Sequence, residues 1–304
     1  MTRDDRKLGR FRDDAARRRF MTAYDDALTF WPCAPEHLDV ATRFGTTHVL
    51  RSGSAEGTPI VLLHAVAVAS PMWFANVGAL GEHHPVYAID TIGDVGRSLQ
   101  TAAIPGAADL AVWLDDALTA LGRDRVHLVG LSYGGWLVLN QALRAPDRLA
   151  GITSIDPPGA FGRPKASFVA SMVPDGFLAK FVHSDPALHR LLARLNDGVP
   201  PAPPLLGLSV AGLRTFRARQ PFPARLKDDE LRRIRTPALL LFGERSPVNR
   251  ASSAAQRARQ FIANAHAEVI SGAGHMLPVQ MPDLFARRVL RFVDEIDERE
   301  RPLP

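Results

Sequence analysis

Short apolar runs alternate with stretches of helical periodicity along this chain, and the alternation limits its fold more than any other feature. Residues 60–63 form an unbroken apolar run, and residues 86–89 and 126–129 are largely apolar. Such runs are typical of parallel strands whose two faces are both buried. Residues 107–121 instead place apolar side chains at the spacing of a helix. This order predicts an α/β fold with a doubly wound, mostly parallel sheet of about eight strands.

The same patterns divide the chain into parts. Residues 12–31 have an amphipathic helical pattern, whereas residues 156–235 lose the rhythm of strands and become rich in proline. We therefore expect a helical N-terminal extension (1–39), a core (40–155 and 236–304) and a helical cap inserted into that core (156–235). Further strands are expected at 43–51, 149–155, 237–242 and 267–270, and further helices at 136–144, 186–195, 251–261 and 282–300.

The composition of the 304 residues is that of an ordinary globular protein, with 46% hydrophobic and 23% charged residues. The formal net charge of +5 comes from arginines that are mixed with acidic residues throughout the chain. Nucleic-acid binding requires basic residues gathered in one stripe, and the sequence shows none. We therefore expect a small-molecule substrate and neither nucleic acid nor a membrane as a partner.

Cysteine usage and the lack of long apolar stretches indicate the compartment. Cys33 is the only cysteine, so an internal disulfide is excluded and a reducing compartment is favoured. No window approaches the roughly 18 apolar residues of a membrane span, and the first residues do not read as a signal peptide. These patterns predict a cytoplasmic protein, either a monomer or a homodimer. His83 and His84 lack acidic or cysteine partners, so no metal is expected.

The residues Gly130-Leu131-Ser132-Tyr133-Gly134 lie between a predicted strand and a predicted helix. A nucleophile on such a turn has a strained backbone, which requires small flanking residues and exposes the hydroxyl at the carboxyl edge of the sheet. The amides at the start of the next helix favour negative charge at the same point. Ser132 is therefore the predicted nucleophile.

A serine hydroxyl needs a base to become an effective nucleophile. His275 follows the last predicted strand in the segment Gly272-Ala273-Gly274-His275, downstream of Ser132. Small residues before the histidine allow the loop to bring the imidazole over the sheet edge. We therefore predict His275 as the base that takes the Ser132 proton.

Over residues 40–297 the chain resembles the α/β-hydrolase superfamily, and within it the small capped esterases, thioesterases and C-C hydrolases. The resemblance rests on His64-Ala65 after an early strand, the loop at residues 90–98, the turn at Ser132 and the segment ending at His275. It implies an oxyanion hole made by the backbone N–H groups of Val66 and Tyr133. Ala65 stands where the family usually has glycine, and the 90–98 loop has one residue more than the common D-x-x-G-x-G-x-S spacing; we interpret that loop as structural.

The acid of the triad is the weakest part of the pattern. The resemblance implies an Asp or Glu three residues after Gly243, and this sequence has Ser246 there. Asp156, at the end of the strand after the nucleophile helix, is the predicted replacement, and Glu244 is an alternative. A third interpretation is a dyad without an acid, which costs about ten-thousandfold in rate in serine proteases.

We therefore expect a serine hydrolase that cleaves an ester, thioester or lactone of a small hydrophobic acyl compound through Ser132, His275 and Asp156. This hydrolysis requires no cofactor. The alternatives are a non-hydrolytic biosynthetic enzyme on the same scaffold, such as a cyclase, lyase or transacylase, and a catalytically silent ligand receptor. Some of the cap's apolar side chains are expected to line the substrate pocket, although most of them pack the cap itself; they are Phe161, Phe168, Met172, Phe177, Phe181 and Phe216.

Overall fold

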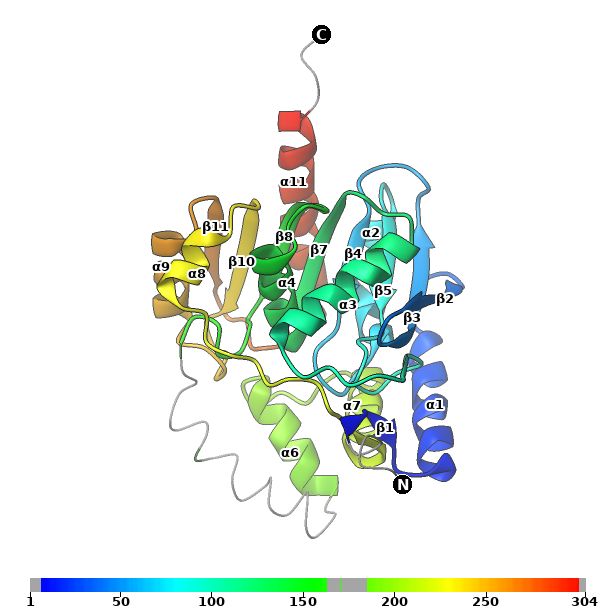
Figure 1. Ribbon diagram of the computed structural model, residues 1–304. Helices are drawn as coiled ribbons and strands as arrows, with labels where there is room; N and C mark the ends of the chain where they lie inside the picture. The colour runs from blue at the N-terminus through cyan, green and yellow to red at the C-terminus, as the bar shows by residue number, and fades with distance from the viewer. Residues whose placement is uncertain (1–6, 163–169, 171–184, 301–304) are drawn as a thin grey trace.

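A nine-stranded sheet forms the centre of the computed structural model, which describes residues 7–162, 170 and 185–300 (Figure 1). Eight strands lie side by side in the order β11-β10-β8-β7-β4-β5-β3-β2, and β6 pairs with β3. Their bounds are β2 Glu36–Thr42, β3 Gly45–Gly53, β4 Ile60–Leu63, β5 Pro85–Ile89, β6 Leu99–Gln100, β7 Val126–Leu131, β8 Leu149–Ile155, β10 Ala238–Gly243 and β11 Ala265–Ile270. Neighbouring strands pair in parallel along the series β11-β10-β8-β7-β4-β5, whereas β3 is antiparallel to β2, β5 and β6. The prediction of a mostly parallel α/β sheet is confirmed.

Helices cover both faces of this sheet (Figure 1). One face packs against α3 (Ala107–Ala120), α4 (Tyr133–Arg144) and α9 (Ala251–Phe261), and the other against α2 (Val77–Gly81) and α11 (Pro282–Glu300). The sequence of β4 is apolar throughout because both of its faces are buried. Val61 and Leu63 pack into the core on one face of the sheet, and Ile60 and Leu62 pack into the core on the other. Among the described residues, no helix has the length and apolar character needed to cross a bilayer.

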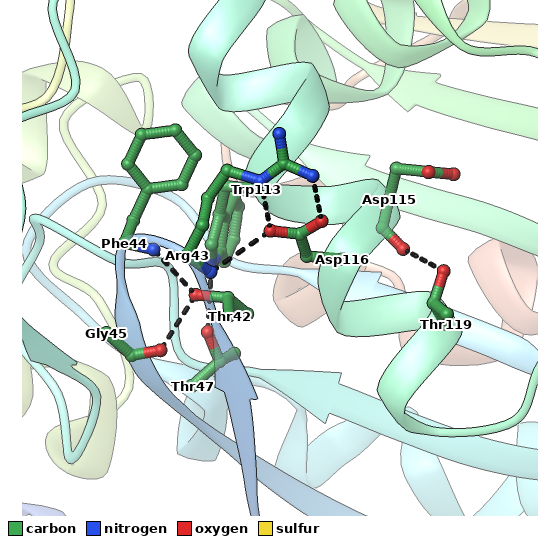
Figure 2. Close-up of polar contacts among 9 residues, drawn as sticks. All are labelled: Thr42, Arg43, Phe44, Gly45, Thr47, Trp113, Asp115, Asp116 and Thr119. Carbon is green, nitrogen blue, oxygen red and sulfur yellow. Dashed lines mark hydrogen bonds and ion pairs between the residues drawn. The ribbon is translucent and has the colours of Figure 1, made fainter.

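The predicted strand over residues 43–51 is one half of a hairpin, because β2 precedes β3 and pairs with it. Arg43 lies at the turn, where its Nε and Nη2 donate to the two carboxylate oxygens of Asp116 on α3, at 2.8 and 2.9 Å (Figure 2). On the same helix, Trp113 Nε1 donates to Thr47 Oγ1 at 2.8 Å. The strand β2 was not predicted because it is a half-exposed edge strand with polar residues on both faces. The sheet therefore begins inside the segment that was assigned to the N-terminal extension.

The chain leaves the sheet between β8 and β10. The described part of this insertion contains α6 (Asp185–Leu195), α7 (Pro203–Thr215), β9 (Phe216–Arg217) and α8 (Asp228–Arg233). Helices α6 and α7 lie beyond one end of the sheet, and α7 packs against α1 (Asp14–Leu28) (Figure 1). Strand β1 (Arg10–Phe11) pairs with β9, and Tyr24 of α1 donates a hydrogen bond to Asp90 Oδ2 at 3.2 Å. The N-terminal segment therefore contacts both the insertion and the core, which its sequence did not predict.

Strand β7 carries a histidine in the core. His127 is fully buried, its Nε2 lies 2.9 Å from Thr153 Oγ1, and burial lowers the pKa of its imidazole to about 3. An unfolded chain binds this proton at an ordinary histidine pKa of about 6.5. Between these two values the unfolded state binds more protons than the folded state, so stability is lost as the pH falls below about 6.5.

We predict that His127→Gln makes the free energy of unfolding less sensitive to acid. The His127 contribution amounts to about 1.4 kcal/mol per pH unit within that window, and glutamine has no group that titrates there. Urea unfolding of both proteins at about pH 7 and about pH 5 measures the two slopes. Equal losses of stability in the wild type and the variant would contradict the prediction.

Candidate active site

Ser132 lies in the sharp turn between β7 and α4. Its φ of 57° and ψ of −117° place it in the left-handed half of backbone space, and its exposed fraction is 8%. A Cβ on Gly130 would stand 2.2 Å from Gly134 O, and a Cβ on Gly134 would stand 2.1 Å from Leu63 O. Both flanking positions therefore require glycine because backbone passes directly against them. The turn is held by Ser132 N, which donates to Ile155 O at 2.9 Å.

The loop after β4 lies against the start of α4, because a Cβ on Gly134 would stand 2.8 Å from His64 O. His64 is buried, its Nε2 accepts from Thr91 N at 2.9 Å, and its Nδ1 therefore carries the proton donated to Ala65 O at 2.7 Å. Val66 follows with an exposed fraction of 48%, while Tyr133 is the first residue of α4 and is buried. The two residues expected to form the oxyanion hole thus come from segments in contact with each other.

The hydroxyl group of Tyr133 binds the insertion. Its hydroxyl donates to Pro221 O at 2.9 Å, in the segment between β9 and α8, and burial raises the pKa of that hydroxyl. Trp136, one turn later on α4, donates from Nε1 to Ala224 O at 2.9 Å. Two side chains of the nucleophile helix therefore fix the segment between β9 and α8 beside the start of that helix.

His275 lies in the loop after β11 and is 4% exposed. Its backbone N–H donates to Leu195 O at the end of α6, at 3.2 Å, and the preceding Gly274 N–H donates to Gln280 Oε1 at 2.9 Å. The loop that carries the histidine is therefore held by the insertion on one side and by α10 (Leu277–Gln280) on the other.

A buried carboxylate contacts the imidazole. Asp156 follows directly after β8, is fully buried, and places Oδ2 2.5 Å from His275 Nδ1. The same Oδ2 accepts a hydrogen bond from Ser246 Oγ, and Oδ1 accepts from Asn249 Nδ2 at 2.8 Å. Because an ionised carboxylate only accepts hydrogen bonds, this arrangement makes His275 Nδ1 the donor and leaves Nε2 free to act as a base.

The two residues that donate hydrogen bonds to Asp156, Ser246 and Asn249, differ in how the sequence marks their positions. Ser246 stands where the resemblance places the acid, and in the structure it is a donor to Asp156. Asn249 was not predicted, since one asparagine three residues further on gives no local signal. Its amide also donates to Pro157 O at 3.1 Å, so it holds the residue after Asp156 in place.

Glu244, the alternative acid, makes other contacts. It is exposed, and its Oε2 accepts from Gly272 N at 2.8 Å and from Ser271 Oγ at 3.0 Å. These hydrogen bonds lower the pKa of Glu244. Glu244 therefore binds the backbone at the start of the histidine loop, whereas Asp156 binds the imidazole.

The apolar residues expected around the substrate are only partly described. Phe161 packs edge-on against Phe242 of β10, with ring centroids 5.6 Å apart, and Phe216 packs against Phe11 at 5.0 Å. Phe168, Met172, Phe177 and Phe181 lie outside the described residues. In the part of the chain that is described, no group of three or more His, Cys, Asp or Glu side chains is arranged to hold a metal ion.

Comparison with known proteins gives consistent matches. Residues 60–288 match the model of the alpha/beta hydrolase family. The sequence is 34% identical over 284 residues to carboxylesterase YbfK of Bacillus subtilis (strain 168), covering 90% of this chain and 93% of that protein. The crystal structure of carboxylesterase CesB (YbfK) from Bacillus subtilis is similar with a TM-score of 0.84 and 32% identity, covering 92% of this chain and 98% of that one. That of naproxen esterase (carboxylesterase NP) from Bacillus subtilis has a TM-score of 0.83 and 31% identity, covering 91% and 98%.

Proposed function

The chain belongs to the alpha/beta hydrolase family, and from this premise we propose that it is a serine hydrolase that cleaves carboxylic esters of small hydrophobic acids. Family membership confirms the resemblance drawn from the sequence. The observation that carries the proposal is the buried hydrogen bond between His275 and Asp156, at 2.5 Å. Its role in catalysis is to orient the imidazole and to stabilise the positive charge that it acquires. The carboxylesterase names of two similar proteins favour an ester over a thioester or lactone.

In the proposed reaction, His275 Nε2 takes the proton from Ser132 Oγ while that oxygen attacks the ester carbonyl. The oxyanion that forms accepts hydrogen bonds from the N–H groups of Val66 and Tyr133. His275 then gives its proton to the departing alcohol, which leaves an acyl group on Ser132. A water molecule, deprotonated by the same imidazole, releases the acid and restores the serine.

The triad acid in this proposal is Asp156, displaced from the position that is usual in the family. Its support is that Ser246 and Asn249 both donate to the Asp156 carboxylate and so hold it against the His275 imidazole. Adjacent strands of a parallel sheet end side by side, and β8 pairs with β10, so acids at either strand end can serve one imidazole. A serine at the usual acid position is thus compatible with a complete triad.

We predict that a fluorophosphonate probe labels Ser132 and that the protein turns over p-nitrophenyl esters of hydrophobic acids. The probe reacts only with serines that a base has activated, so the buried serines Ser154 and Ser246 provide internal comparisons. Peptide mapping by mass spectrometry locates the label, and release of p-nitrophenolate measures turnover. Absence of labelling would favour a silent receptor or chemistry that does not use the serine, and labelling without turnover of esters, thioesters or lactones would favour the non-hydrolytic alternatives.

A further inference from the structure

The loop that carries Val66 has an unusual backbone. Within this segment, residues 64–69, which we call the oxyanion loop, Ala67 has a φ of 65° and Ala69 a φ of 60°. Residues with a side chain adopt such values only when contacts around them hold the backbone there. Without those contacts we expect the loop to relax and Val66 N–H to change direction.

One of these contacts comes from a buried acid that the proposed mechanism does not use. Asp94 is 2% exposed, its Oδ2 accepts from Ala67 N at 3.1 Å, and its Oδ1 accepts from Val95 N at 2.8 Å. The side chain of Gln220 also forms a hydrogen bond with it, although burial still raises the pKa of Asp94. Asp94 belongs to the longer 90–98 loop, which has two residues between Gly93 and Gly96 where the common spacing has one.

A second contact comes from the insertion. Gly212 of α7 faces Ala67, and a Cβ built on this glycine would stand 2.3 Å from Ala67 O and 3.0 Å from Val95 Cγ1. Backbone therefore packs on backbone, and even a methyl group would displace one of the two segments. Gly207, on the same helix, serves as a comparison, because a Cβ at that position would have no atom within 4 Å.

We propose that Asp94 and Gly212 are positioning residues that fix Ala67 and thereby aim the preceding N–H group, that of Val66, at the oxyanion. Asp94 binds the N–H of Ala67, while Gly212 of α7 limits the movement of the Ala67 carbonyl. Neither residue touches the reacting atoms, so each acts through the oxyanion loop. This inference rests on the proposed function, since it needs Val66 to be an oxyanion donor.

The test compares Asp94→Asn and Gly212→Ala with the control Gly207→Ala. Asparagine keeps the size of Asp94 but has one acceptor oxygen, so it cannot bind Ala67 N–H and Val95 N–H as aspartate does. We expect both variants to lower kcat by about tenfold to hundredfold, somewhat less than removal of an oxyanion donor, with KM changed by less than about twofold. The rate of fluorophosphonate labelling should fall by a similar factor, and Gly207→Ala should match the wild type.

A rescue variant separates positioning from a general loss of stability. Glycine adopts a φ near 65° readily, so Ala67→Gly should restore part of the kcat that Asp94→Asn removes. Thermal melting shows which variants are folded at the assay temperature. If Asp94→Asn does not fold, the inference is tested by comparing Gly212→Ala with Gly207→Ala. Alanine is favoured over glycine inside a helix, so neither substitution should weaken α7 itself.

The possible outcomes separate this inference from the proposed function. Labelling of the wild type, with wild-type kcat in folded Asp94→Asn and Gly212→Ala, would overturn the inference alone. Equal losses in Gly212→Ala and Gly207→Ala would also overturn it, because the effect would then belong to the helix. If the wild type neither labels nor turns over esters, the proposed function fails and the inference fails with it.

Discussion

The Ser132→Ala variant is expected to hydrolyse esters about a millionfold more slowly than the wild type, which is the loss seen when the nucleophile of a serine hydrolase is removed. Alanine keeps the Cβ and the backbone of the turn, so folding should be retained. The φ of 57° is imposed by the surrounding strands and by the close approach at Gly130 and Gly134, and this does not depend on the hydroxyl. The large loss of activity would therefore reflect the missing nucleophile and not a change in folding.

Steady-state assays with a p-nitrophenyl ester measure this loss, and thermal melting shows that the variant is folded. The matched control is Ser154→Ala, because Ser154 is also a buried serine and its Oγ donates to Gly135 O at 2.9 Å, next to the same turn. We expect this control to lose about 1 kcal/mol of stability but to keep most of its activity. Adding His275→Ala to Ser132→Ala should cause little further loss, since the two residues act as a unit. Substantial turnover by Ser132→Ala would require another nucleophile.

The Asp156→Asn variant is expected to lower kcat by about ten-thousandfold. The asparagine amide can donate to His275 Nδ1, which moves the ring proton to Nε2, and Nε2 can then no longer accept the proton of Ser132. Glu244→Gln is the control, because it also neutralises a carboxylate near the histidine loop but changes contacts to Gly272 and Ser271 instead of contacts to the imidazole. We expect its kcat to stay within about twofold of the wild type.

A double variant tests whether the acid can return to its usual place. Ser246 Oγ and His275 Nδ1 both contact Asp156 Oδ2, so a carboxylate introduced at residue 246 starts close to the imidazole. Asp156→Asn combined with Ser246→Asp should therefore recover part of the activity lost by Asp156→Asn alone. Loss of activity in Glu244→Gln equal to that in Asp156→Asn would refute the assignment of Asp156.

Local chemistry explains which features were readable from the amino-acid order. The apolar run of β4 follows from burial on both faces, so the strand and its neighbours could be predicted without any contact being known. The turn at Ser132 was equally readable, because its two glycines lie within two residues of the serine and answer a local steric demand. The half-exposed strand β2 could not be predicted, since its strand conformation depends more on pairing with β3 than on its own composition.

The partner of the imidazole was decided by tertiary structure alone. Asp156, Glu244 and a dyad without an acid were each compatible with the sequence, because both carboxylates follow strands that end at one edge of the sheet. Asp156 lies 119 residues from His275 and 90 residues from Ser246, and the parallel pairing of β8 with β10 and of β10 with β11 brings the three residues to one edge of the sheet. The contact of Asp94 with Ala67, 27 residues apart, has the same origin. Hydrogen bonds between such distant residues depend on how the strands and loops pack, and no local pattern records that packing.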